Sequence, residues 1–219
     1  MTDKNKEKEV KITDVAKVVL IGEAGVGKTS LIARFVNDAF DPNSSSSLGA
    51  SFTAKTINFP EFQRQLKFDI WDTAGQEKYR ALTKVLYKDA KVIIFVYDIT
   101  NLKSFEAITD FWYGTINDSI AKPPVYAIAA NKSDLYEKEE VDEAQAKEFA
   151  EKIGAIFKTT SALSNEGIDT LFNYIGKKII DKAFNYIDDE KGDVDIEDEF
   201  TLDDRVIRDR DEMGRSRCC

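Results

Sequence analysis

The chain has 219 residues and a formal net charge of -9, with 42% hydrophobic and 32% charged residues. This length suits one packed domain with extensions. The negative charge argues against nucleic-acid binding, because phosphate neutralisation requires clustered Lys and Arg. No run of about 18 apolar residues is present, so we expect no membrane span and a protein made in the cytosol. Histidine is absent, which excludes histidine-based proton transfer.

The beginning of the chain changes from charged to apolar residues. Residues 1–15 are mostly charged and show no hydrophobic period, which predicts a flexible extension and an ordered chain from Ala16. The apolar run Val18–Ile21 predicts a strand, and Ser30–Val36 predicts a helix. A glycine-rich segment, Gly22–Thr29, lies between them. A strand, a glycine loop and a helix in this order are typical of a phosphate-binding loop.

The segment Gly22–Thr29 has the spacing G-x-x-x-x-G-K-S/T. Its glycines allow backbone N–H groups and the helix N-terminus to face a polyphosphate. Lys28 would place a charge on the β- and γ-phosphates, and Thr29 would offer a hydroxyl to Mg²⁺. The alternative is a glycine-rich turn that binds nothing. The predicted nucleotide contacts here are Glu23, Ala24, Gly25, Val26, Gly27, Lys28, Thr29 and Ser30.

Next comes a polar stretch followed by a hairpin pattern. Asn37–Gly49 contains four consecutive serines and no apolar face, which predicts a mobile loop. Ser51–Phe59 and Leu66–Trp71 each alternate apolar and polar residues on either side of Pro60 and Glu61. This alternation predicts a β-hairpin at the edge of a sheet.

The second half of the chain alternates short apolar runs with helical stretches. Val92–Val96 and Val125–Ala129 are continuously apolar, as in strands that are buried on both faces. The predicted fold class is α/β: a P-loop NTPase domain with a mostly parallel six-stranded sheet, one antiparallel edge hairpin and helices on both faces. Ligands of such sheets bind beyond the carboxyl ends of the strands. The remaining predicted elements are helices near 104–120, 142–152 and 168–184, and a short strand over 155–159.

Polar residues follow the last two predicted strands. Asp134 can accept two hydrogen bonds from guanine, from N1–H and the amino group, a donor pair that adenine does not offer. Asn131 can bond the base or tie loops together, and the Lys132 stem can lie along the base. For Asn131–Asp134 the alternative is a surface turn. The segment Ser161, Ala162 and Leu163 would supply a backbone N–H to guanine O6.

The segment Trp71–Glu77 ends the second strand of the hairpin. Asp72 lies where a carboxylate would hold a Mg²⁺-bound water, and Gly75 offers an N–H to a γ-phosphate. The Gln76 amide can both accept and donate, so it can orient a water for in-line attack. Alternatively, Asp72 caps the following helix and Gln76 faces solvent.

The end of the chain is strongly acidic. From Asn185 onward, 13 Asp and Glu stand against 6 Lys and Arg, a net charge of -7. This composition predicts a disordered tail over 185–219. The alternative is an additional helix over Asp203–Met213. Both cysteines are terminal, so no disulfide is expected in the core.

Four segments, in matching order and spacing, resemble those of the Ras-like small GTPases: Gly22–Thr29, Trp71–Glu77, Asn131–Asp134 and Ser161–Leu163. The resemblance covers a G domain over residues 16–184. Within this group the chain is similar to the Rab family, through Phe52, Trp71, Val96–Thr100 and the final Cys218-Cys219 pair. Gly49–Phe52 is similar to the endosomal Rabs.

The resemblance implies a switch that binds GTP or GDP with Mg²⁺ and hydrolyses GTP slowly, in endosomal or other vesicle traffic. It implies catalytic roles for Gln76 and Lys28, contact of Phe40 with the guanine, and metal ligation by Thr29, Ser47 and Asp72. Ser47 stands where Thr is usual, so we expect a looser GTP-bound switch. Leu86 stands where Rabs usually have a surface Tyr, and Tyr87 could take its place.

The resemblance also implies partners and an anchor. These partners are a nucleotide exchange factor, a GTPase-activating protein, a GDP-dissociation inhibitor or prenylation escort, and effectors at Phe52 and Trp71. Cys218 and Cys219 would carry two geranylgeranyl chains, which hold the protein on the cytoplasmic face of endosomal membranes while it cycles with the cytosol. A cysteine disulfide or metal site is the alternative. Two competing functions are a non-hydrolysing GTP-binding scaffold and a small-molecule kinase.

Overall fold

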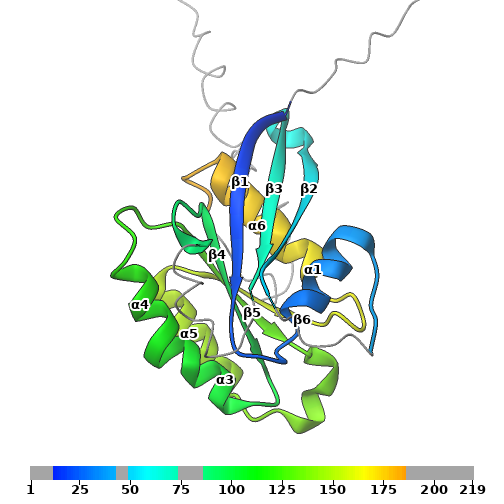
Figure 1. The fold of residues 1–219 in the computed structure, drawn as a ribbon, viewed down its shortest axis with the longest axis vertical. Coiled ribbons are helices and arrows are strands. Elements are labelled where there is room, and N and C mark those ends of the chain that lie inside the picture. The colour runs from blue at the N-terminus through cyan, green and yellow to red at the C-terminus, as the bar shows by residue number, and fades with distance from the viewer. Residues whose placement is uncertain (1–11, 43–48, 74–85, 186–219) are drawn as a thin grey trace, which may run out of the picture. The chain divides into compact units, whose positions relative to one another are not determined.

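The structure, a computed structural model, describes residues 12–42, 49–73 and 86–185. Six strands form one sheet in the order β2-β3-β1-β4-β5-β6, in which the β2–β3 pair is antiparallel and the other pairs are parallel (Figure 1). The predicted α/β fold is therefore confirmed. The strands are β1 (Ile12–Ile21), β2 (Ser51–Phe59), β3 (Arg64–Asp72), β4 (Val92–Asp98), β5 (Val125–Asn131) and β6 (Ile156–Thr160).

The edge hairpin forms as the alternating pattern predicts. Ser51 lies opposite Asp72 and Phe59 lies opposite Arg64 across β2 and β3. The turn uses a 3-10 helix, η1 (Pro60–Phe62), and then Gln63 in the left-handed region at φ 53. Along β3 every second side chain is buried, which places Leu66, Phe68 and Ile70 on one face, whereas Trp71 packs against the core on the other face.

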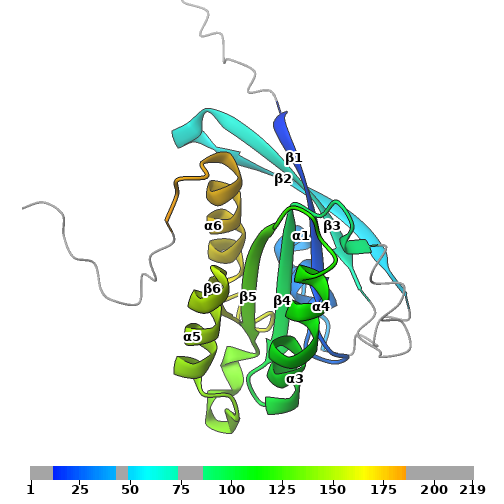
Figure 2. The same cartoon turned by 90° about the vertical axis from the view of Figure 1, so that its left-hand side faces the viewer.

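One face of the sheet is covered by α1 (Lys28–Asn37) and α6 (Ile168–Ile180). Phe35 of α1 and Phe172 of α6 stack with ring centroids 3.6 Å apart, and both lie near Phe68 of β3. In both views α6 lies on the opposite side of the sheet from α3 and α4 (Figures 1 and 2). These aromatic contacts hold α1, which directly follows the glycine loop, against the sheet.

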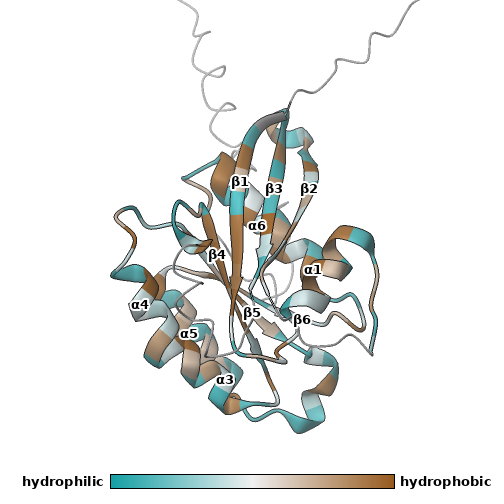
Figure 3. Cartoon of the chain, in the orientation of Figure 1, coloured by the Kyte–Doolittle hydropathy of each residue, from teal (hydrophilic) through white to brown (hydrophobic). Residues whose placement is uncertain are grey.

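The other face carries the remaining helices. Hydrophobic residues run along β4 beneath them (Figure 3), and all seven residues of that strand are buried. Such a strand needs apolar cover on both faces, as predicted. The helices are α3 (Leu102–Ala107), a π turn η3 (Ile108–Trp112), α4 (Tyr113–Asn117) and α5 (Glu143–Ile153), with a 3-10 helix η4 (Ser133–Lys138) after β5.

Three predicted boundaries were wrong. β1 begins at Ile12 rather than at Ala16, because Ile12 already pairs with Gln65 of β3. α6 ends at Ile180 rather than at Phe184, because Asp181 leaves the helical conformation and its carboxylate accepts the Ala183 N–H at 2.9 Å. The helix predicted near 104–120 is interrupted by the π turn η3. None of the helices in the described ranges has the length and hydrophobicity to span a bilayer.

Candidate nucleotide-binding site

The loop between β1 and α1 wraps around the side chain of Lys28. This residue begins α1 and is only 5% exposed, and its Nζ donates to the carbonyl oxygens of Gly22 at 2.8 Å and Glu23 at 2.9 Å. Burial lowers the pKa of Lys28 to about 8, although Asp72 and Glu23 act in the opposite direction. The loop therefore holds the Lys28 ammonium group at the place where the motif spacing predicts a phosphate.

Two glycines of this loop are required by close contacts. A Cβ on Gly27 would lie 2.4 Å from Nδ2 of Asn131, and the φ of Gly27 is 96°. A Cβ on Gly22 would lie 2.1 Å from the Val96 carbonyl oxygen of β4. Both positions need glycine because neighbouring segments approach the loop backbone directly.

The end of β3 meets the start of α1 where the Asp72 carboxylate and the Thr29 hydroxyl bind each other. Thr29 Oγ1 donates to Asp72 Oδ2 at 2.6 Å, and Asp72 is 3% exposed. The next residue, Thr73, donates its hydroxyl to the Leu20 carbonyl of β1 at 2.7 Å, which fixes this strand end. A hydroxyl and a carboxylate are hard ligands of the kind that Mg²⁺ uses together with phosphate oxygens, so the pair fits that ion.

Asn131, the last residue of β5, joins the phosphate loop to the base-binding segments. It is 1% exposed, its Nδ2 donates to the Val26 carbonyl at 2.8 Å, and its Oδ1 accepts from Thr160 Oγ1 at 3.2 Å. Of the two roles considered for Asn131, the structure shows the tie between loops. The next residue, Lys132, has a left-handed backbone at φ 66, and its Nζ lies 2.6 Å from Asp98 Oδ2.

The two segments that were predicted to bind the base are bonded to each other. Ser161 is fully buried, and its hydroxyl donates to Asp134 Oδ1 at 2.5 Å. A carboxylate offers about four acceptor positions, so Asp134 retains capacity for further donors. The segments that follow β5 and β6 therefore hold the Asp134 carboxylate in one position. A guanine would need such an acceptor for its N1–H and amino groups.

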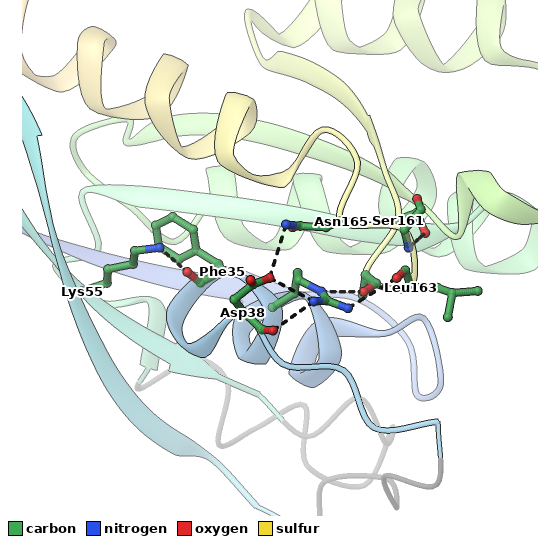
Figure 4. A network of polar contacts seen from close by, with 9 residues as sticks. Phe35, Asp38, Lys55, Ser161, Leu163 and Asn165 are labelled. Atoms are coloured by element: carbon green, nitrogen blue, oxygen red, sulfur yellow. Dashed lines mark hydrogen bonds and ion pairs between the residues drawn. The ribbon is translucent and has the colours of Figure 1, made fainter.

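An arginine that the sequence analysis did not single out supports this region, in which Figure 4 labels Asp38, Ser161, Leu163 and Asn165. Arg34 of α1 donates to the carbonyl oxygens of Ala162 at 2.9 Å and Leu163 at 3.3 Å. It also pairs with Asp38 at 2.9 Å, and Asn165 donates to the same Asp38 carboxylate at 3.4 Å. The segment Ser161–Leu163 is thus anchored to the helix that begins at Lys28.

Other supporting residues were also missed. The Arg34–Asp38 spacing of four on a helix was a visible signal. Asp98 lies within the Val96–Thr100 segment that carried the Rab resemblance, although its bond to Lys132 was not foreseen. The Thr160 bond to Asn131 had no signal, because it joins residues 29 apart in sequence.

Several predicted residues lie outside the described part of the chain: Ser47, Gly75, Gln76, Cys218 and Cys219. Phe40 is described; it is half-buried and packs against the core beneath α1 and α6. The structure thus brings together Lys28, Thr29 and Asp72 on the phosphate side. It brings Asn131, Lys132, Asp134 and Ser161 together on the base side.

The predicted effector residues form a pair on the hairpin. Phe52 is 52% exposed, and its ring centroid lies 5.2 Å from that of Trp71. Leu86 and Trp71 are both half-buried against the core beneath α3 and α5. The idea that Tyr87 takes the place of the missing surface Tyr was wrong: Tyr87 is 2% exposed and belongs to that core.

Comparisons with known proteins agree with this geometry. Residues 17–181 match the Ras family. Ras-related protein Rab-22A of Homo sapiens is 44% identical over 164 residues, which cover 74% of this chain and 82% of the relative. Rab-31 of Mus musculus is 44% identical over the same shares of both chains, and RABA4b of Arabidopsis thaliana is 41% identical over 77% of this chain and 74% of its own. The chain therefore belongs to the Ras family and is a Rab GTPase.

Proposed function

We propose that the chain is a guanine-selective switch that binds GTP or GDP with Mg²⁺, hydrolyses GTP slowly and regulates endosomal vesicle traffic through effectors. One observation carries this proposal. The Asn131 bond to the Val26 carbonyl joins the loop around Lys28 to the segment that holds Asp134. A ligand that spans this junction must carry phosphates at one end and a base at the other.

Base selection would rest on Asp134. Its carboxylate accepts from guanine N1–H and the amino group, while the backbone of Ser161, Ala162 or Leu163 donates to O6 and Phe40 packs against the ring. Adenine lacks this donor pair, so the carboxylate would keep its Ser161 bond but lose two charge-assisted hydrogen bonds, which together are worth several kcal/mol. Discrimination on the order of 10⁴ follows from a cost of that size.

Phosphate binding would use the backbone N–H groups of residues 23–30 and the Lys28 ammonium. Lys28 would exchange its bonds to the Gly22 and Glu23 carbonyls for bonds to the β- and γ-phosphates. Thr29 and Asp72, together with Ser47, would hold Mg²⁺. When bound, this ion neutralises charge that develops on the phosphates.

Hydrolysis would depend on Gln76, which orients the attacking water, and on Lys28, which stabilises charge on the transferred group. Gly75 and Ser47 would contact the γ-phosphate, and loss of that phosphate would release their segments for effectors to sense. Because no arginine was identified by sequence as a finger in cis, a GTPase-activating protein would supply one. Such a finger is worth up to about 10⁵-fold.

The remaining parts of the proposal concern partners and attachment. An exchange factor would release GDP, effectors would bind at Phe52 and Trp71, and a GDP-dissociation inhibitor or escort would carry the lipidated form. Cys218 and Cys219 would carry two geranylgeranyl chains at the end of the acidic tail, 185–219. Two chains give stable anchoring where one is marginal. Replacing either cysteine by Ser should shift the protein toward the cytosol in a fractionation experiment.

The test is single-turnover hydrolysis of GTP and of ATP, with Mg²⁺ or with a chelator. Wild-type protein, Gln76→Leu and the exposed helical control Gln145→Leu would be compared. We expect slow, Mg²⁺-dependent turnover of GTP alone, lost in Gln76→Leu and kept in the control. Tight GTP binding without turnover in any of the three would instead support the scaffold.

A further inference from the structure

The helix over the second face of the sheet contains an irregular turn that ends beside the phosphate loop. In η3 (Ile108–Trp112) the Tyr113 N–H bonds to the Ile108 carbonyl, five residues earlier. Such π turns are rare, and they change the direction in which the following side chains point. The last residue of this turn is Trp112, which is 4% exposed.

Trp112 makes a direct bond to the phosphate loop. Its indole Nε1 donates to Glu23 Oε1 at 3.3 Å, across 89 positions of sequence. A buried indole N–H usually requires such a partner. The ring is also held from its own helix, because Phe111 packs against it edge-on with centroids 5.1 Å apart.

Glu23 connects this bond to the phosphate site. It is the second residue of the loop, and its own carbonyl oxygen accepts from Lys28 Nζ at 2.9 Å. The Glu23 carboxylate is close enough to Lys28 to oppose the effect of burial on the pKa of that lysine. The position of the Glu23 side chain therefore helps to set the backbone conformation from which Lys28 is held.

We propose that Trp112 is a positioning residue of the phosphate loop: its indole N–H holds Glu23, keeps the loop in the conformation that receives phosphates, and thereby slows nucleotide release. This inference rests on the proposed nucleotide binding. It assigns to the π turn the role of aiming Trp112 at the loop, and it gives the indole N–H a role that a phenylalanine, which has no such donor, could not fill.

The first experiment measures the dissociation rate of a fluorescently labelled GDP from full-length protein. Trp112→Phe, which keeps an aromatic ring but removes the donor, should release GDP about 5- to 30-fold faster. Glu23→Ala should do the same, and Glu23→Gln, which keeps an acceptor, should have a smaller effect. The double variant Trp112→Phe/Glu23→Ala should be no faster than either single variant, because both remove the same bond.

Ile116→Val is the matched control. Ile116 is fully buried on the same helix, one turn beyond Trp112, so this change weakens the core without touching the bond. We expect it to lower the unfolding temperature while leaving GDP release within about twofold of the wild-type rate. Unchanged release in Trp112→Phe, additive effects in the double variant, or equal acceleration in the control would each overturn the inference.

A spectroscopic measurement tests the bond without a nucleotide. The chain has two tryptophans, so Trp71→Phe leaves Trp112 as the single emitter. Its emission should shift when Glu23→Ala is added, because the indole N–H loses its acceptor, and should shift less with Glu23→Gln, which keeps one. If wild-type protein holds no labelled GDP, the proposed function fails. In that case an emission that Glu23→Ala leaves unchanged would overturn the inference as well.

Discussion

The part of the site predicted to bind the base and the part predicted to bind the phosphates differ in what holds their polar side chains in place. On the base side, side chains from segments far apart in sequence bind one another: Ser161, which follows β6, binds Asp134 of η4, and Thr160 of β6 binds Asn131 of β5. On the phosphate side, Lys28 binds carbonyls of its own loop. The base side is thus in place before a ligand arrives, whereas the phosphate side must exchange bonds. Base selectivity and overall affinity should therefore respond to different changes.

The two sides meet at Asn131. Its amide donates to the Val26 carbonyl of the phosphate loop, and its approach to Gly27 leaves no room for a Cβ. Changes on the phosphate side should therefore weaken GTP and ATP alike, changes on the base side should alter which nucleotide is bound, and changes at this junction should do both. The predictions below test that separation.

The largest effect is expected for Lys28→Met, which keeps the apolar stem and removes the charge. Loss of two or more charge-assisted bonds should weaken binding of GTP and ATP alike by about 10²- to 10⁴-fold, with their ratio unchanged. Burial disfavours the charged form of Lys28, so the free energy of unfolding of the unliganded variant should rise by up to about 3 kcal/mol. Its urea midpoint should rise accordingly. Titration calorimetry and urea unfolding measure the two effects. The control Lys103→Met, at an exposed position of α3, should change neither.

A smaller effect is expected from pH. Lys28 has a pKa of about 8 in the unliganded protein, and a bound polyphosphate would raise it. Below pH 8 the lysine is charged in both states, so affinity does not change. Above pH 8 the Lys28 amine of the unliganded protein is neutral and must take up a proton when GDP binds. The dissociation constant for GDP should therefore rise about tenfold per pH unit. In Lys28→Met this slope should vanish; a slope that persists would assign the titration to another group.

The smallest effect is expected at the junction, and two glycines allow a matched comparison. Gly25 and Gly27 both have positive φ, at 80° and 96°, but only a Cβ on Gly27 meets another group within 4 Å. An alanine at either position would have a strained backbone, at a cost of about 1–3 kcal/mol, because its φ would be positive. Gly27→Ala should therefore lower GTP affinity by about tenfold more than Gly25→Ala and also narrow the preference for GTP over ATP. Equal effects would show that the Asn131 contact has no influence.

Local sequence patterns predicted most of the fold. The alternation of Ser51–Phe59 and the apolar run of β4 depend on neighbouring residues alone, and both elements formed where expected. The errors depended on tertiary contacts or on competing local bonds. Ile12 joins β1 because it pairs with Gln65, and α6 stops because the Asp181 side chain competes for a backbone N–H. Neither contact can be predicted from the periodicity of hydrophobic residues along the chain.

The site shows the same division. Lys28, Thr29 and Asp72 follow from spacing after strands, and the structure brings them together. The bonds of Arg34 to Ala162 and of Trp112 to Glu23 join residues 128 and 89 positions apart. The burial of Tyr87 depends on how the chain enters β4, which pattern alone does not fix. Sequence therefore identified the groups that would touch a ligand better than the groups that hold them in place.

The central claim, that Asp134 selects guanine, is tested most directly by calorimetric titration of wild-type protein and Asp134→Asn with GTP, ATP and xanthosine triphosphate. An asparagine amide can accept from N1–H and donate to the C2 oxygen of xanthine. We predict that wild-type protein binds GTP alone among the three, and that the variant loses GTP by about 10²-fold or more while gaining the xanthine nucleotide. Equal binding of ATP and GTP by wild-type protein, or unchanged GTP binding by the variant, would contradict the account.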